Sequence, residues 1–204
     1  MQKKMERHMT NDGISLLSQG LICALKYRDE NTLLHSKRVA GLAFDIGKQC
    51  DLPLRDIDNL IIGANLHDIG KIGIADNIYL KPGRFNHVER EEMKSHSEKG
   101  QMIIDNLSFP GQDIVAKVVR HHHENFDGSG YPDNLAGKEI PILSRIISIV
   151  DNYDALSEKR SYHGIKKHDE VIGIMRDEAQ IKFDPKVFKI FLKVIETSSL
   201  KQNF

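Results

Sequence analysis

The sequence predicts a single all-α domain, and three observations support this fold class. Apolar residues recur at the three- and four-residue spacing of amphipathic helices in segment after segment of the 204-residue chain. Alternating apolar and polar runs are too short for a β-sheet, and no repeat, low-complexity tract or linker divides the chain. A chain of this length buries about 70% of its unfolded surface, so it forms a core without disulfides or a partner.

The apolar periods and the capping signals give the expected order of helices. The predicted helices cover residues 14–25, 34–46, 55–69, 86–95, 98–107, 110–122, 141 onward, 168–179 and 186–195. Asn86 followed by Glu89 is typical of a capping box, and Asp184 with Pro185 is typical of a helix start. Segments 70–84 and 125–138 are expected to be irregular, because glycine, proline and other turn formers interrupt them.

Charge and composition exclude several classes of protein. The 29 basic and 29 acidic residues cancel, so no general attraction for DNA or an anionic membrane is expected. Two cysteines are too few for a disulfide scaffold or a cysteine-rich zinc site. No run of about 18 apolar residues is present, and no secretory segment follows the charged N-terminal residues. The sequence therefore predicts a cytoplasmic protein that binds neither DNA nor a membrane.

Histidine is unusually frequent, with ten in the chain, and helical geometry places several of them on apolar faces. His35 shares a face with Val39 and Leu42, and His67 continues an apolar stripe. Asp151 points into an apolar seam, where an unpaired carboxylate costs several kcal/mol. A cationic partner for Asp151 is therefore expected.

Seven imidazole and carboxylate groups on or beside such faces are the candidate ligands of a metal site: His35, His67, Asp68, His96, His122, His123 and Asp151. A single inward histidine is more often a hydrogen-bonded core residue, but seven such groups would need an unusual number of separate partners. Imidazole and carboxylate without thiolate favour iron, manganese or nickel, with zinc compatible, over calcium or a structural zinc cage. Seven groups exceed one tetrahedral shell, which predicts two divalent cations sharing Asp68 and a pocket that attracts phosphate. Four other histidines are expected at the solvated surface: His8, His87, His163 and His168. His121 is either a surface residue, the preferred interpretation, or a spare ligand.

Two strings of residues resemble a known family. His67-Asp68-Ile69-Gly70-Lys71, with His35 before it and Asp151 after it, is similar to the H…HD…D order of the HD phosphohydrolase superfamily. The string His122-His123-Glu124-Asn125-Phe126-Asp127-Gly128-Ser129-Gly130-Tyr131-Pro132 resembles the signature of the HD-GYP family, bacterial cyclic di-GMP phosphodiesterases. The similarity covers about residues 31–192 and includes Lys71-Ile72-Gly73-Ile74, Leu80-Lys81-Pro82-Gly83, Asp154-Ala155-Leu156 and Phe183-Asp184-Pro185.

This resemblance implies an HD-type helical bundle with a bi- or trinuclear metal centre, usually iron or manganese, in its core. Residues 31–204 would form the HD-GYP catalytic domain, and residues 1–30 an N-terminal extension with the first helix. An extension of that length is too short for a sensor or receiver domain.

The resemblance also implies a role for each matching residue. One metal would be held by His35, His67, Asp68 and Asp151, and the second by the bridging Asp68 with His96, His122 and His123. Asp68 and Lys71 are the predicted catalytic residues, with Lys71 beside the scissile phosphate. The predicted substrate-binding residues are Lys71, Gly130, Tyr131, Pro132, Asp154 and Arg160. The Gly130-Tyr131-Pro132 loop implies a diguanylate cyclase domain as a further partner.

Several of these residues keep a second interpretation. Asp154 either orients a ligand or relays a proton, or it is a helix-packing carboxylate paired with Arg145 or Arg160. Lys71 alternatively caps the preceding helix at the surface, and Tyr131 alternatively packs within a tight turn. Arg160 alternatively forms a surface ion pair. Gly128 and Gly130 alternatively supply backbone freedom rather than direct contacts.

The sequence departs from the family pattern at three informative positions. Members with three metals have a glutamate four residues before the first ligand histidine, and here that position is Asn31. Because a neutral amide is a poor ligand for a third cation, two metals are predicted. Asn125 and His163 stand where the family has basic residues, so fixed positive charge near the phosphates is reduced.

The sequence thus predicts a phosphodiesterase that hydrolyses cyclic di-GMP to pGpG, GMP or both, by attack of a metal-bridging hydroxide. One alternative substrate is cyclic GMP-AMP. A second hypothesis is a non-catalytic module that senses a cyclic dinucleotide or docks a cyclase. A third is an HD enzyme of different chemistry, either a nucleotide phosphohydrolase or a di-iron oxygenase. Metal identity, oligomeric state and regulatory input stay open at this point.

Overall fold

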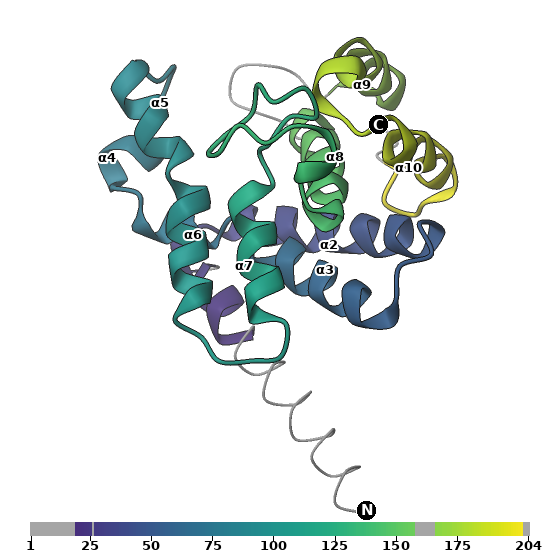
Figure 1. Ribbon diagram of the computed structural model, residues 1–204. Helices are drawn as coiled ribbons and strands as arrows, with labels where there is room; N and C mark the ends of the chain where they lie inside the picture. The colour runs from purple at the N-terminus through teal and green to yellow at the C-terminus, as the bar shows by residue number, and fades with distance from the viewer. Residues whose placement is uncertain (1–18, 26, 158–165, 202–204) are drawn as a thin grey trace, which may run out of the picture.

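α-Helices account for the regular structure of this protein (Figure 1). The computed structural model describes residues 19–25, 27–157 and 166–201. Within these residues no β-strand occurs, and the only sheet-like pairing is an isolated bridge between Asp127 and Ala136. The predicted all-α fold class is therefore confirmed. None of the helices in the described part of the chain combines the length and apolar character needed to cross a bilayer.

Residues 19–25 are helical and precede α2. The helices that follow are α2 (Glu30–Gln49), α3 (Leu54–Leu66), α4 (Asp76–Tyr79), α5 (His87–Lys94), α6 (His96–Asp105), α7 (Gln112–His121), α8 (Ile142–Ser157), α9 (His168–Lys182) and α10 (Pro185–Thr197). Two short 3-10 helices accompany them, η1 (Ile69–Gly73) and η2 (Gly137–Glu139).

The predicted capping signals begin their helices as expected. The Asn86 side chain accepts a hydrogen bond from the Glu89 backbone N–H, and the Glu89 carboxylate accepts one from the Asn86 N–H. These reciprocal bonds satisfy two of the donors that the start of α5 would leave unpaired. The Asp184 side chain caps α10 by accepting hydrogen bonds from the backbone N–H groups of Lys186 and Val187.

Other helix ends differ from the sequence prediction. The helix predicted over 55–69 ends at Leu66, and the segment predicted to be irregular holds η1 and α4. Both short elements contain about one turn, which is too little for an apolar period to show. Helix α6 begins at His96 instead of Glu98. Helix α7 begins at Gln112 instead of Pro110, because Gly111 adopts a left-handed conformation with φ +85°.

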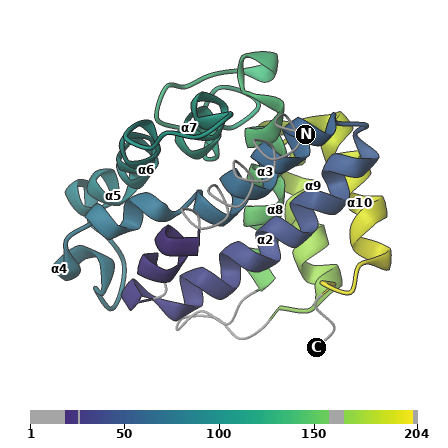
Figure 2. The same ribbon diagram turned by 90° about the horizontal axis from the view of Figure 1, so that it is seen from below.

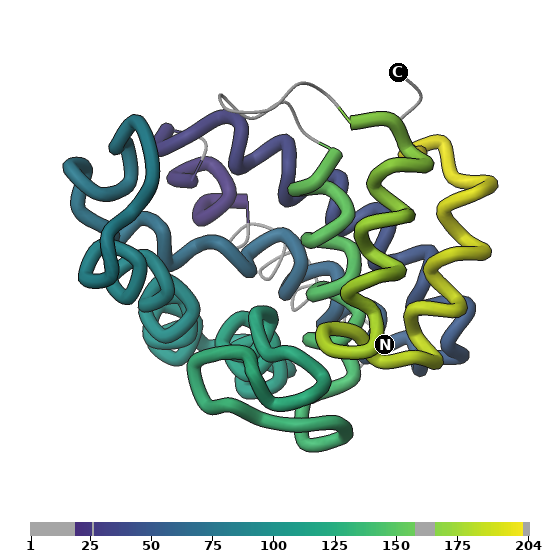
Figure 3. Tube along the Cα trace, turned by 90° about the horizontal axis from the view of Figure 1, so that it is seen from above, coloured from purple at the N-terminus to yellow at the C-terminus, as the bar shows by residue number. Residues whose placement is uncertain are grey.

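Two apolar clusters form the core, and residues of the smaller one lie close in sequence to predicted ligands. The larger cluster joins α2, α3, α8, α9 and α10, and the smaller joins the helix over residues 19–25 to α6, α7 and the end of α3. Helix α8 lies between the α6–α7 pair on one side and the α9–α10 pair on the other (Figures 1 and 3). His67 directly follows Leu66, and His122 comes three residues after Val119; Leu66 and Val119 both belong to the smaller cluster.

A close backbone approach holds η1 against α6. A side-chain carbon added at Gly70 would lie 1.8 Å from the His96 carbonyl oxygen and 2.5 Å from the Gly100 nitrogen. Only a residue without a side chain fits at this contact. The contact therefore fixes the segment that follows Asp68 beside the first turn of α6.

Candidate metal centre

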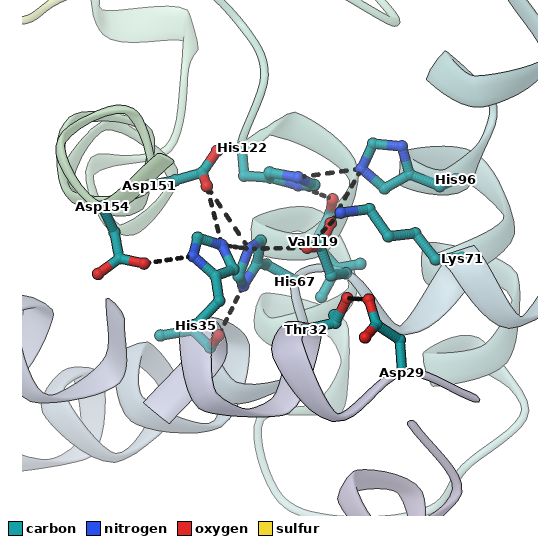
Figure 4. Close-up of polar contacts among 12 residues, drawn as sticks. Asp29, Thr32, His35, His67, Lys71, His96, Val119, His122, Asp151 and Asp154 are labelled. Atoms are coloured by element: carbon teal, nitrogen blue, oxygen red, sulfur yellow. Dashed lines mark hydrogen bonds and ion pairs between the residues drawn. The ribbon is translucent and has the colours of Figure 1, made fainter. Parts of the chain in front are cut away.

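The seven predicted ligand side chains converge from five segments of the fold. Figure 4 labels five of them, His35, His67, His96, His122 and Asp151. They form three overlapping groups in which the ligand atoms lie within 4.8 Å of one another. These groups are His35–His67–Asp151, His67–Asp68–His122 and His96–His122–His123. The shared residues make one continuous cluster rather than separate core histidines.

Three of the imidazoles are held in the same tautomer. His67, His96 and His122 each donate Nδ1–H to the carbonyl three residues earlier, at 2.7, 2.7 and 2.6 Å respectively. A carbonyl only accepts, so the proton lies on Nδ1 and the Nε2 lone pair faces the cluster. The Nε2 atoms of His96 and His122 lie 3.3 Å apart. Two facing lone pairs at this distance repel each other unless a proton or a metal ion lies between them.

His35 is oriented by a carboxylate instead. Its Nδ1 atom lies 2.7 Å from Asp154 Oδ2, while its Nε2 atom lies 3.0 Å from Asp151 Oδ1 and 3.3 Å from His67 Nε2. Asp154 also accepts two hydrogen bonds from Arg38, at 2.7 and 2.8 Å. Burial opposes the charged imidazole, but the bonds to Asp151 and Asp154 raise the pKa of His35 to about 10.

Asp154 therefore lies behind His35 rather than in contact with the pocket. It is buried with 1% exposure. Its arginine partner is Arg38, not Arg145 as one interpretation expected, since Arg145 donates to Asp184. This geometry suits a residue that orients a ligand histidine and offers no contact to a substrate.

Asp68 lies between the ligand groups. Its Oδ1 atom is 3.4 Å from His96 Nε2, and its Oδ2 atom is 3.5 Å from His67 Nε2. Lys71 donates to Asp68 Oδ2 at 2.6 Å. Burial would raise the pKa of Asp68, but Lys71 and the nearby imidazoles hold it well below its ordinary value. Asp68 is therefore an anion that faces both groups.

The imidazoles of His122 and His123 are neutral. Desolvation and the neighbouring His96 lower the pKa of His123 to about 3. Burial, reinforced by His123, lowers the pKa of His122 well below its ordinary value. Neutral imidazoles beside ionised carboxylates are the protonation states that metal ions require. The clusters therefore provide the donor set of a divalent-metal site.

A pocket of about 650 Å³ opens above these ligands. Its lining includes five of the predicted ligands, His35, Asp68, His96, His123 and Asp151, together with Lys71. The other lining residues are Asp29, Asn31, Thr32, Tyr79, Phe85, Met93, Tyr131, Asn152, Ala155, Leu156 and Lys166. The Tyr131 ring stacks on His123 with centroids 4.8 Å apart, and the Lys94 ammonium lies 5.4 Å from the Tyr131 centroid. Tyr131 is thus the predicted loop residue that reaches the pocket.

The other predicted loop residues support the loop itself. A side-chain carbon at Gly130 would lie 2.2 Å from the Asn125 nitrogen and 2.5 Å from Glu124 Cα, so Gly130 allows a close backbone approach. Neither Gly130 nor Pro132, which follows a cis peptide bond, is among the residues that line the pocket.

Sequence reasoning assigned no role to two residues that hold this loop. Buried Glu124 accepts a hydrogen bond from the Asp133 backbone at 2.7 Å. The Asp133 carboxylate accepts two hydrogen bonds from Arg120 at 2.6 Å and contacts His121 Nε2 at 2.8 Å. The one available signal was the position of Glu124 directly after the histidine pair.

The histidines expected at the surface have mixed outcomes. His87 is exposed, as predicted. His168 is buried, contrary to the prediction, with Nδ1 at 3.0 Å from the Tyr153 hydroxyl and Nε2 at 3.2 Å from Glu196. His121 is only partly exposed because it contacts Asp133. His8, His163 and the predicted substrate-binding Arg160 lie outside the described residues.

The helical fold and its histidine–aspartate cluster define a member of the HD domain family. The HD domain model matches residues 21–187, and the chain belongs to this family. The chain is also 36% identical over 169 residues to a cyclic di-GMP phosphodiesterase of Thermotoga maritima, covering 83% of this chain and 46% of the relative. It is 34% identical to the 3'3'-cGAMP-specific phosphodiesterase 1 of Vibrio cholerae, covering 81% of this chain and 38% of the relative. The chain thus spans less than half the length of these two curated relatives.

A solved structure supports the fold. Bd1817, an HDG"Y"P protein from Bdellovibrio bacteriovorus, aligns with a TM-score of 0.65 at 20% identity, over 81% of this chain and 52% of that one. The resemblance to HD-GYP phosphodiesterases, predicted from the two strings of residues, is confirmed by the family match and by the named relatives.

Proposed function

We propose that this chain is a metal-dependent phosphodiesterase that hydrolyses a cyclic dinucleotide. The observation that carries the proposal is the set of inward-facing Nε2 lone pairs around ionised Asp68, at the base of a pocket that also presents Lys71. Such a site attracts divalent cations first and a phosphodiester second.

The donor set suits two metal ions, with iron or manganese first and nickel or zinc compatible. His35, His67 and Asp151 would hold one ion, and His96, His122 and His123 the other, with Asp68 shared. Asn31 lines the pocket at the position where a third ion would need an anionic ligand, so two ions are proposed.

When bound, the two cations supply a nucleophilic water of lowered pKa and positive charge for the phosphate oxygens. The chain's own residues do the rest. Lys71, partly exposed and hydrogen-bonded to Asp68, adds a positive charge that stabilises the developing negative charge on the phosphorane oxygens. Desolvation opposes this ammonium, but Asp68 raises the pKa of Lys71, so it stays protonated. Tyr131, stacked on His123, offers an aromatic face to the nucleotide.

Cyclic di-GMP is the first candidate substrate, and cyclic GMP-AMP is the second. Relatives of similar identity are named for each of these substrates, 36% for the former and 34% for the latter. Chromatography of the products from both compounds, with pGpG and GMP as standards, determines the preference and the extent of hydrolysis.

The decisive experiment compares two variants by metal analysis and product chromatography. The unsubstituted chain is expected to hold about two metal ions and to cleave a cyclic dinucleotide. Asp68→Ala is expected to lose both metal and activity, because it removes the shared ligand. Lys71→Ala is expected to keep the metal and lose activity at least about 100-fold, as is typical when a charge-stabilising donor is removed. Full turnover by Asp68→Ala would overturn the proposed site.

Each of the other hypotheses predicts a distinct result for the unsubstituted chain. A chain that binds cyclic di-GMP in the presence of manganese but leaves it intact would be a sensor or docking module. Oxygen consumption by the iron-loaded chain would indicate oxygenase chemistry. Docking of a diguanylate cyclase through Gly130-Tyr131-Pro132 and a cytoplasmic location both stay predictions.

A further inference from the structure

The charges in the pocket wall bear on how a cyclic dinucleotide would be oriented. Such a substrate carries two phosphodiesters, and only one of them is at the scissile position. Among the described residues that line the pocket, the lysines are Lys71 and Lys166. Lys71 donates to Asp68 at 2.6 Å, so its ammonium lies beside the metal ligands, where the scissile phosphate is proposed to bind. The second phosphate therefore needs another cation.

The pocket end formed by the start of α2 is unfavourable for a phosphate. The Asp29 carboxylate accepts hydrogen bonds from the Thr32 hydroxyl at 2.8 Å and the Tyr79 hydroxyl at 2.7 Å. Burial would raise the pKa of Asp29, but these bonds lower it, so the group is an anion. Since both hydroxyl protons point at Asp29, this end presents negative charge and oxygen lone pairs.

The end formed by α8 has the opposite character. Lys166 lies two residues before α9 and lines the pocket with Ala155 and Leu156 of the last turns of α8. The start of α9 lies beside the C-terminal end of α8 and apart from the start of α2 (Figures 2 and 3). Lys166 is partly exposed, and no hydrogen bond or ion pair engages it within the described residues. Its ammonium group is therefore available to a ligand.

We propose that Lys166 binds the phosphate that is not being hydrolysed, and so selects substrates with two phosphodiesters. This inference rests on the proposed function, because it assigns one phosphate to the metal centre. The ring of the dinucleotide would then extend from the metal ligands toward α8, while the Asp29 end would receive hydrogen-bond donors of a base or a ribose. Lys166 is a specificity-determining residue here and takes no part in the bond cleavage.

The test is a comparison of two substrates. Lys166→Ala is expected to raise KM for cyclic di-GMP about tenfold and to change kcat less than about twofold, as expected for a lost charge-assisted hydrogen bond. Hydrolysis of bis(p-nitrophenyl) phosphate, which has a single phosphodiester, is expected to stay unchanged. Lys166→Arg should restore the KM for cyclic di-GMP. Lys167→Ala is the matched control, since Lys167 is exposed and does not line the pocket.

Two results would overturn the inference alone. One is an unchanged KM for cyclic di-GMP in Lys166→Ala, and the other is an equal loss of activity on both substrates. A different result would overturn the proposed function as well. In that case the unsubstituted chain would leave cyclic dinucleotides uncut, whether or not it binds them in calorimetry, so the defect would be present before any substitution.

Discussion

The Arg38–Asp154 pair determines how His35 presents its Nε2 atom to the proposed metal site. Arg38 fixes both carboxylate oxygens of Asp154, and Asp154 in turn holds the Nδ1 side of His35. A carboxylate behind a ligand histidine fixes its ring orientation and increases its basicity. This pair therefore influences the metal without touching it.

Asp154→Asn is expected to weaken manganese binding about 10- to 100-fold, because the amide keeps the shape but removes the charge behind His35. Titration calorimetry of the metal-free chain with manganese measures the change. Asp45→Asn is a matched control, since Asp45 is a partly exposed carboxylate on the same helix as His35 and pairs only with Lys48 in the described structure. Equal manganese affinity in Asp154→Asn and the unsubstituted chain would show that Asp154 only packs the helices.

At the residue scale, the sequence predicted the side chains whose direction follows from one helix. His35 and Asp151 share faces with apolar neighbours, so the helical period alone predicted that both point inward; His35 is buried, and Asp151 is partly exposed to the pocket. Arg38 was not predicted, because its role depends on how α2 lies against α8 rather than on either helix. A sequence pattern gives the face of a residue but not its partner on another element.

At the scale of elements, the contact between η1 and α6 brings Asp68 to His96. Gly70→Ala is expected to destabilise the chain by about 3 kcal/mol, because the new carbon overlaps the His96 carbonyl and the backbone must move. Urea unfolding followed by circular dichroism measures the change in the free energy of unfolding. The same variant should bind less manganese, since the shift separates Asp68 from His96.

Gly173→Ala provides the control for that substitution. Gly173 lies inside α9 with no atom within 4 Å of the added carbon. Replacement there is expected to be neutral or stabilising by roughly 0.5–1 kcal/mol, because it reduces the freedom of the unfolded chain. If Gly70→Ala and Gly173→Ala had similar free energies of unfolding, the backbone at the η1–α6 contact would accommodate an extra carbon at little cost.

The loop after α7 is fixed by an ion pair whose strength depends on pH. Hydrogen bonds from Arg120 lower the pKa of Asp133 to about 2, against an ordinary value of 3.8. Because the folded-state pKa is depressed, the stabilisation is complete well above pH 3.8 and is lost as the pH falls through about 2. The difference in thermal midpoint between the unsubstituted chain and Asp133→Asn should therefore narrow from pH 6 to pH 3. If the difference in thermal midpoint grew as the pH fell, Asp133 would not have the depressed pKa assigned to it.

The elements themselves were predictable where they are long or capped. Helices α5 and α10 begin where their capping pairs predict, whereas the apolar period predicted the body of α2 but not its start, which lies at Glu30 instead of Leu34. The elements η1 and α4 were missed because one turn shows no period, and the start of α7 shifted to follow Gly111. These misses cluster around the site because His67, Asp68 and His96 lie at helix ends, where local periodicity gives the least information.

At the scale of the whole molecule, the proposed metal centre links five segments that span the chain from His35 to Asp151. A ligand that binds only the folded state stabilises it, by about 2.7 kcal/mol at a free concentration 100 times its dissociation constant. For a chain of this size, that corresponds to a rise of about 5–11 °C in the thermal midpoint. Manganese is therefore expected to raise the midpoint of the metal-free chain by this amount, as measured by differential scanning calorimetry.

Two variants and a second cation separate manganese binding at the proposed centre from nonspecific stabilisation of the chain by a divalent cation. Asp68→Ala should lose most of the manganese-dependent rise, since Asp68 faces both ligand groups. Lys71→Ala should keep it or increase it, because removing the ammonium leaves the Asp68 carboxylate without a competing cation. Magnesium, which prefers oxygen ligands, should give a smaller rise at the same concentration. If Asp68→Ala showed the full rise with manganese, the ion would bind elsewhere and the five segments would be held together by packing alone.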